Sequence, residues 1–285
     1  MKNLLILMLS ATISACAPPQ SKTSNSSITL GSIASKYETS ANRLIEAALK
    51  DTSGFERLAE MCDTFGPRFS GTDNLEKAID WILSEMNRDG LSNVHGEAVM
   101  IPKWVRGNES AHMVSPWKKE LHMLGLGGSI GTPPEGITAD VMVVSSFDEL
   151  EDRSDEAKGK IVLFNVPFTN YGKTVSYRSG GAVAASKAGA VASIIRSVGP
   201  YSMNTPHTGN SRYEDGVKKI PHAAITVEDA AMIGRMVNRG QTVTVKLKME
   251  GRYEEDVPSR NAVAEIRGSE YPEEVVVMGG HIDSW

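Results

Sequence analysis

The segment KIVLFNV, residues 160–166, decides the fold class together with the two segments that follow it, GGAVAASKAG at 180–189 and VASIIR at 191–196. The first and the third are short apolar runs of the kind that forms buried strands. The second consists mainly of residues small enough to let a helix pack closely on a sheet. A strand, a helix and another strand in this order predict an α/β unit.

The same pattern continues on both sides of these segments. Residues 139–144 form a further apolar run, and the apolar residues of 227–238 fall on one face of a helix. Residues 242–250 alternate apolar with polar, which is typical of a strand with one buried and one wet face. We therefore expect a small α/β domain at residues 116–251.

Two long loops are expected to interrupt this domain, at residues 169–179 and 197–221. Structureless runs of this length tend to be functional lids or disordered linkers. Both loops contain aromatic residues, and the second contains His207, which favours the lid interpretation.

The segment before this domain predicts two amphipathic helices, at residues 40–49 and 72–88, with Thr72 as the N-cap of the second. Between them lies the turn GPRFSGT, residues 66–72. It lacks the lysine and the spacing of a phosphate-binding loop. We interpret its single Arg68 as half of an ion pair that holds the turn.

The segment after the domain carries the residues best suited to chemistry. Residues 274–278 form an uninterrupted apolar run that predicts a central strand, and GGHIDS, residues 279–284, follows at its carboxyl end. His281 and Asp283 are two residues apart, so a strand would place both side chains on one face. An imidazole is a common zinc ligand and a nearby carboxylate can orient it. A hydrogen-bonded surface pair without metal is the alternative.

Composition excludes several classes of protein. The 285 residues include 30 Lys and Arg against 35 Asp and Glu, a net charge of −5, so a nucleic-acid partner is not expected. At 40% hydrophobic and 23% charged residues the chain is typical of globular proteins. Its two cysteines cannot form a disulfide scaffold.

The amino terminus predicts export. Residues 1–15 combine a positive start, an apolar core and a small-residue end, as in a secretory signal. Cys16 follows, and ISAC resembles a bacterial lipobox, which implies lipidation of Cys16 and a membrane anchor in the periplasm or outer membrane. Plain secretion is the alternative. Cys62 is then the single free thiol, and we predict that it is packed in the core.

Three ordered motifs resemble the zinc-dependent exopeptidases of the carboxypeptidase Q (plasma glutamate carboxypeptidase) type: GPRFSGT at 66–72, SRNAVAEIRG at 259–268 and VVVMGGHIDSW at 275–285. The middle of the chain, including IPHAAITVEDAAMIGRMVNRG at 220–240, resembles the protease-associated domain inserted in those enzymes. The resemblance implies an α/β fold, in which a partial zinc-exopeptidase domain with a mixed sheet and flanking helices carries an inserted protease-associated α/β domain.

This resemblance implies a division of the chain into five parts. They are a lipoprotein-type signal peptide at 1–15, a flexible tether at 16–30, the first part of the peptidase domain at 31–115, the protease-associated domain at 116–251, and the first catalytic-domain strands with the metal motif, cut short, at 252–285.

The resemblance also implies roles for individual residues. His281 would bind one of two zinc ions, with Asp283 behind it as a catalytic-site acid, and His207 in the PHTG loop would face the substrate. The family's other zinc ligands and its general-base Glu follow this motif, so none is expected before Trp285. We therefore expect an incomplete and inactive N-terminal portion of a metallo-exopeptidase that hydrolyses peptides or dipeptides.

Several points stay open at this level. Carboxypeptidase, aminopeptidase and dipeptidase activities all fit the family, and a homodimer is not excluded. A membrane-anchored module that binds a peptide or a protein without catalysis is the alternative function. The remaining candidates are weaker. We expect His95, His112, His122 and His222 to be surface or capping residues, and we rank Tyr171, Tyr177 and Arg178 below His207 as substrate-facing residues.

Overall fold

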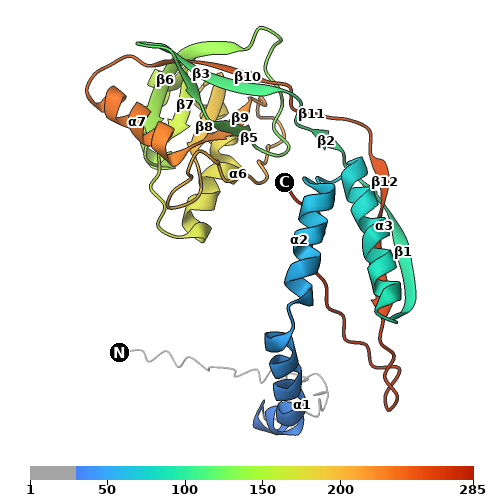
Figure 1. Cartoon of the computed structure of the whole chain (residues 1–285). Coiled ribbons are helices and arrows are strands. Elements are labelled where there is room, and N and C mark those ends of the chain that lie inside the picture. Colours follow the sequence, from blue (N-terminus) through green and yellow to red (C-terminus); the bar gives the residue numbers. More distant parts are fainter. Residues whose placement is uncertain (1–29) are drawn as a thin grey trace, which may run out of the picture. The chain divides into compact units, whose positions relative to one another are not determined.

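The computed structural model describes residues 30–285, which fall into two compact units divided between residues 57 and 58 (Figure 1). The expectations for the signal peptide and Cys16 lie outside the described residues. Among the described helices, none is both long and apolar enough to cross a bilayer.

The first unit contains helix α1 (Leu30–Lys50) and the start of α2 (Ser53–Phe65), which continues into the second unit. Helix α1 begins ten residues before the predicted start at residue 40. Its apolar stripe includes Leu44 and Leu49, and both side chains are exposed. In α2, the prediction for Cys62 is wrong, because its thiol lies on the exposed side of the helix.

The second unit begins with a helix packed on a two-stranded ribbon. Helix α3 (Asp73–Arg88) starts after Thr72, whose side chain accepts a hydrogen bond from the backbone of Leu75, so the predicted helix and its N-cap are confirmed. It packs on the antiparallel strands β1 (Ser92–Ile101) and β12 (Val257–Glu265). Glu76 of α3 accepts hydrogen bonds from Ser259 and Arg260 of β12.

An eight-stranded mixed sheet forms the largest part of the second unit. Its strands β6 to β9 are parallel, and the others pair antiparallel. From edge to edge the strands are β4 (Lys119–Leu121), β3 (Glu109–Ser115), β10 (Thr244–Met249), β6 (Ile137–Val144), β7 (Ile161–Phe164), β8 (Ala192–Arg196), β9 (His222–Ile225) and β5 (Met123–Gly125). The short strands β2 (Trp104–Val105) and β11 (Arg252–Tyr253) form a separate pair.

Helices cover both faces of the parallel strands. In β7, Ile161 and Leu163 pack in the core that contains α7 (Val227–Asn238), whereas Val162 and Phe164 pack in the core that contains α6 (Tyr171–Lys187). This follows from the period of two along a strand. It also explains why KIVLFNV is apolar without alternation, since both of its faces are covered. The short helices α4 (Phe147–Asp152) and α5 (Ser154–Ala157) complete the unit. The α/β fold expected from the sequence is confirmed.

Two of the expectations for secondary structure are wrong. Residues 171–179 belong to α6 and not to a loop, and Asn170 caps the helix by accepting a hydrogen bond from the backbone of Lys173. Residues 274–278 form no strand, and Val275 to Met278 are exposed. A strand needs a neighbour for its backbone hydrogen bonds, and no segment among residues 30–285 pairs with this one. Residues 197–221, all described, contain no helix or strand, as expected.

Candidate functional site

His281 and Asp283 lie together after the exposed apolar run. The Nδ1 atom of His281 is 3.2 Å from Oδ1 of Asp283, and the His281 side chain is 95% exposed. If Nδ1 carries the proton and its N–H donates a hydrogen bond to this carboxylate, the lone pair of Nε2 stays free on the exposed side of the ring. This tautomer is the one that binds a metal ion through Nε2.

The turn at residues 66–72 holds the backbone on both sides of Asp283. Arg68 is buried, and its Nε donates to the carbonyl oxygen of Ile282 at 3.1 Å. The backbone N–H of Arg68 donates to Oγ of Ser284, and the N–H of Ser284 donates to the carbonyl oxygen of Arg68. The guanidinium also donates to the carbonyl of Gly66. The interpretation of Arg68 as half of an ion pair is therefore wrong, because among the described residues these donors reach carbonyl oxygens.

Aromatic side chains connect the 66–72 turn and the end of the His281 motif to the loop after β5 of the large sheet. The ring of Trp285 lies 4.7 Å from that of Phe69, and Phe69 lies 5.6 Å from Trp104. The Nε1 atom of Trp104 donates to the carbonyl of Ser129, in the loop after β5. Gly127 of the same loop lies against the Trp285 ring, where a Cβ atom would meet ring carbons at 2.1 Å. The His281 motif, the 66–72 turn and this loop therefore pack together.

A zinc ion fits this site only in part. His281 with its carboxylate partner fits one imidazole ligand and the group that orients it. A structural or catalytic zinc ion needs at least three protein ligands. Among residues 30–285 no group of three or more His, Cys, Asp and Glu side chains is placed to hold a metal ion. The described chain therefore supplies one candidate ligand and not a complete site.

A second cluster forms where the long loop meets the first turns of α6. His207 lies with its ring 6.0 Å from that of Tyr171. Arg178 donates to the hydroxyl of Tyr171 and to the carbonyl of Thr208. Partial burial, and then the charge of Arg178, lower the pKa of His207, so its ring is neutral at pH 7. Three candidates from the sequence, His207, Tyr171 and Arg178, are thus neighbours.

Tyr177, the fourth, is not part of that cluster. Its ring stacks on Phe147 at 4.5 Å, and it packs in the core between α4 and α6. A groove of about 470 Å³ lies on the neighbouring surface of α6, lined by Phe147, Gly180, Val183, Tyr213 and other residues.

The remaining histidines differ in their surroundings. His112 and His95 are exposed, as expected. His222 is not a surface residue, because β9 lies inside the sheet and the side chain is fully buried. Its Nδ1 faces the carbonyl oxygen of Ser193 and its Nε2 that of Arg178. Burial lowers the pKa of His222 to about 4.

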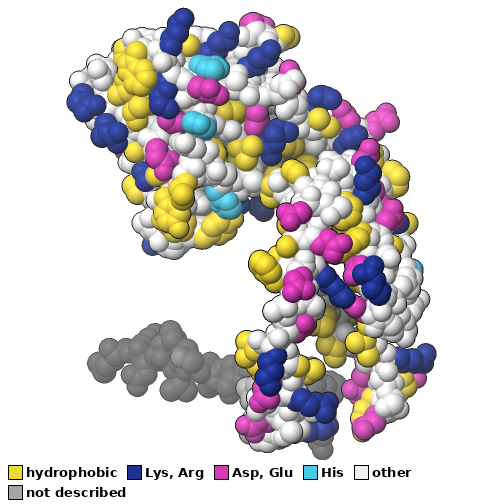
Figure 2. Space-filling model, in the orientation of Figure 1, with side chains coloured by type: hydrophobic (Ala, Val, Ile, Leu, Met, Phe, Trp, Pro, Cys, Tyr) yellow, Lys and Arg dark blue, Asp and Glu magenta, His cyan; other side chains and the backbone are white. Residues whose placement is uncertain are grey.

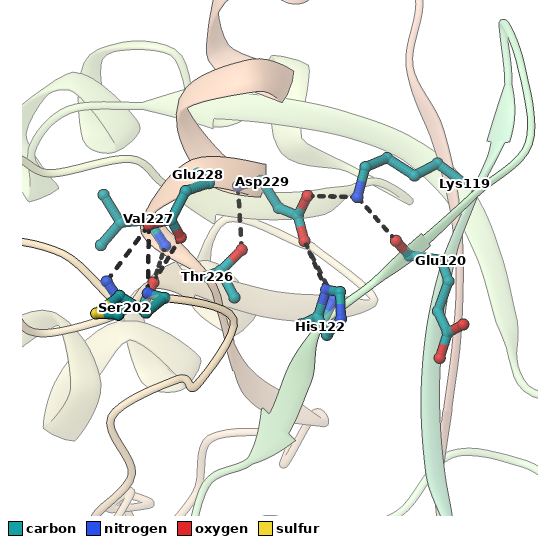
Figure 3. A network of polar contacts seen from close by, with 9 residues as sticks. Lys119, Glu120, His122, Ser202, Thr226, Val227, Glu228 and Asp229 are labelled. Atoms are coloured by element: carbon teal, nitrogen blue, oxygen red, sulfur yellow. Dashed lines mark hydrogen bonds and ion pairs between the residues drawn. The ribbon is translucent and has the colours of Figure 1, made fainter.

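Figure 3 shows how the first turn of α7 fixes the segments around it. Asp229 accepts hydrogen bonds from Lys119 at 2.8 Å and from the backbone of His122 at 3.1 Å. On the other side, Glu228 accepts from the hydroxyl of Ser202, and that hydroxyl accepts from the backbone of Val227. Sequence reasoning missed this network; the one local signal for it is Thr226, a residue suited to capping, directly before the acidic residues of α7. It is a structural network and holds the long loop at Ser202.

The surface charges are mixed in sign. On the face seen in Figure 2, acidic and basic side chains of the described residues alternate over both units. This agrees with the net charge of −5 and offers no extended basic surface on that face.

The mixed sheet with helices on both faces makes the larger part of the second unit an α/β domain. Residues 133–233 match the family model of the PA domain. The chain therefore carries this domain, and the match lies within the region 116–251 expected from the sequence.

The relatives of the chain are peptidases. It is 56% identical to human carboxypeptidase Q over 231 residues, which cover 81% of this chain and 49% of that protein. It is 54% identical to mouse carboxypeptidase Q over 252 residues, covering 87% and 54%. The chain thus spans about half the length of the curated relatives it matches.

Two solved structures of peptidases also align with the chain. The crystal structure of a Peptidase M28 precursor from Shewanella amazonensis SB2B aligns with a TM-score of 0.83 and 34% identity, covering 88% of this chain and 58% of that one. A zinc aminopeptidase from Bacillus subtilis aligns with a TM-score of 0.53 at 22% identity and covers 76% of this chain and 47% of that one, a likeness of fold alone.

Proposed function

We propose that this chain is part of a zinc-dependent exopeptidase that hydrolyses peptides or dipeptides. The observation that carries the proposal is the pair formed by His281 and Asp283, with Nδ1 and Oδ1 3.2 Å apart and the rest of the imidazole exposed. The identity to carboxypeptidase Q and the fold of the M28 peptidase support it.

In this proposal His281 binds zinc and Asp283 orients its imidazole. A pair of zinc ions, when bound, supplies the Lewis acidity for attack of water on a peptide carbonyl. The carboxylate of Asp283 accepts a hydrogen bond from Nδ1–H of His281, which fixes the tautomer and raises the basicity of Nε2 toward a cation. The other ligands and the general base are proposed to come from the part of the longer protein that this chain does not contain.

The test compares the full-length gene product with its His281→Ala variant and with residues 30–285 alone. We expect the full-length protein to hydrolyse members of a dipeptide panel, to lose this activity to a chelator and to regain it with zinc. His281→Ala should lower kcat/KM by more than about 100-fold, since a metal ligand is lost. The shorter chain should be inactive, because it offers no complete ligand set among its described residues.

The matched control is His95→Ala, which removes an exposed imidazole from β1 and should leave activity unchanged. A full-length protein that is inert on the whole panel with zinc present would contradict the proposal. So would a His281→Ala variant with wild-type kcat/KM.

The same proposal extends to the second cluster and to the amino terminus. We infer that His207 faces the substrate, with Tyr171 and Arg178 holding its loop; the hydrogen bond from Arg178 to the carbonyl of Thr208 supports this. We also infer export, with a lipid anchor at Cys16 or secretion without one. The signal-like sequence of residues 1–15 supports export.

A second candidate is a lipoprotein module that binds a peptide or a protein without catalysis. The groove of about 470 Å³ on α6 favours it, because Phe147, Val183 and Tyr213 give it apolar walls while Lys187 and Glu214 offer polar groups. Binding of peptides by a full-length protein that never cleaves them would favour the module over the peptidase.

A further inference from the structure

The turn GPRFSGT is fixed before it reaches the candidate site. Gly66 and Gly71 both have positive φ, at 61° and 83°, which suits glycine at the two ends of the turn. Thr72 donates from its hydroxyl and its backbone to the carbonyl of Phe69, and it caps α3. The turn is therefore a rigid extension of the helix, and Arg68 lies within it.

From this position Arg68 holds the two peptide groups that flank Asp283. Its Nε donates to the carbonyl of Ile282, which belongs to the peptide group before Asp283. Its own carbonyl accepts the N–H of Ser284, which belongs to the peptide group after Asp283. Peptide groups are planar, so fixing both of them fixes φ and ψ of the residue between. This sets the direction of the Cα–Cβ bond of Asp283, from which its carboxylate reaches Nδ1 of His281.

The burial of Arg68 indicates that its hydrogen bond to Ile282 is a stable part of the fold. Arg68 is 5% exposed, whereas the His281 side chain is 95% exposed. A buried guanidinium costs free energy unless its donors are satisfied, and two of them are satisfied by the carbonyls of Gly66 and Ile282. Among residues 30–285 the exposed imidazole has its hydrogen-bond contact with Asp283, so its orientation depends on that carboxylate.

We propose that Arg68 is a positioning residue for the metal-binding motif: by holding the peptide groups of Ile282 and Ser284, it aims Asp283 at Nδ1 of His281 and leaves Nε2 free for a cation. This rests on the proposed function, in which His281 is a zinc ligand. Lysine cannot replace Arg68 here, because one ammonium group does not reproduce the two directed N–H donors of the planar guanidinium.

The experiment measures the zinc affinity of the full-length protein by competition with a chromogenic chelator. Arg68→Lys should weaken zinc binding by about 10- to 100-fold, as is usual when a group that orients a metal ligand is disturbed. Asp283→Asn should weaken it to a similar degree. The double variant should be no weaker than Asp283→Asn alone, because both changes remove the same orientation of His281.

Two controls separate positioning from simple loss of stability. Arg252→Lys changes an exposed arginine paired with Glu254 and should leave zinc affinity unchanged. If Arg68→Lys does not fold, Ser284→Ala replaces it, since it removes only the acceptor of the Arg68 N–H; it should weaken zinc binding several-fold and also be non-additive with Asp283→Asn.

Two results would overturn the proposal for Arg68. Folded Arg68→Lys or Ser284→Ala with wild-type zinc affinity would do so, as would losses that add fully to that of Asp283→Asn. A His281→Ala variant that binds zinc and hydrolyses peptides normally would instead refute the proposed function itself.

Discussion

At the scale of single residues, His222 shows how strongly burial can change an ordinary side chain. The sequence placed it among surface or capping histidines, because a lone His in a loop-rich segment carries no sign of its depth. In the structure it sits in β9 beneath α6, with a ring carbon close to Gly181. Neutral imidazole has one N–H, so it can donate to only one of the two carbonyls that its nitrogens face.

This burial predicts acid sensitivity. The pKa of His222 is about 4 in the folded chain, against about 6.5 when unfolded, so the unfolded state binds the proton first. The stability that neutral His222 contributes is present above pH 6.5 and is lost as pH falls from 6.5 toward 4. The loss amounts to about 3 kcal/mol at most. Thermal unfolding between pH 7.5 and 4 should show it.

The variants for this test are His222→Asn and, as the control, His112→Asn. His222→Asn should unfold at a lower temperature than wild type at pH 7, and its unfolding temperature should then fall less on acidification. His112 is exposed, so its replacement should leave the slope unchanged. Parallel pH profiles for wild type and His222→Asn would argue against this account.

At the scale of elements, the predictions succeeded where one physical signal dominated. Thr72 and the apolar period after it gave α3, and the alternation in residues 242–250 gave β10. Helix α6 was found only in its second half, since its small residues pack on the sheet without an apolar stripe and Gly172 lowers helix propensity. The strand at 274–278 failed because apolar content does not supply a pairing partner.

Adjacent glycines in α6 give a matched test of this packing. A Cβ atom on Gly180 would meet only Phe147 at 3.8 Å, whereas one on Gly181 would meet His222 at 3.0 Å and Phe164 at 3.2 Å. Gly180→Ala should therefore stabilise the fold by about 0.5 to 1 kcal/mol through helix propensity. Gly181→Ala should be less stable than Gly180→Ala, because buried neighbours must move.

Chemical denaturation of the two variants beside wild type measures the difference. Equal free energies of unfolding for Gly180→Ala and Gly181→Ala would mean that α6 does not press on the His222 ring as described.

At the scale of the whole molecule, the candidate site combines what sequence could and could not provide. The spacing of His281 and Asp283 predicted that a strand would place them on one face; the structure has no strand there but still brings Nδ1 and Oδ1 within 3.2 Å. The contact with Arg68 did not, because 214 residues separate it from Ile282 and no local pattern reports such a distance. The association of His207 with Tyr171 and Arg178 likewise depends on how the long loop returns to α6.

The exposed apolar run predicts how the described chain behaves in solution. Val276 is 93% exposed and Val277 88% exposed, in an extended segment with free backbone hydrogen-bonding groups. Such segments promote association. Purified residues 30–285 should self-associate in a concentration-dependent way in analytical ultracentrifugation, and Val276→Lys should shift them toward monomer. Ser269→Lys, which makes the same change of charge at an exposed position outside the apolar run, should have less effect; an equal effect would point to net charge.

The anchoring of the long loop by Ser202 limits how it can move. Its hydroxyl is tied to Glu228 and Val227, and Asn210 is bridged to Gly127 farther along. The part of the long loop between these two contacts is therefore short, residues 203–209, and it is held at both ends. The backbone N–H of His207 also donates to Oγ of Ser197, so this segment is held near its middle as well as at both ends. The ring of His207 is therefore expected to move by less than on the order of 10 Å while these contacts persist.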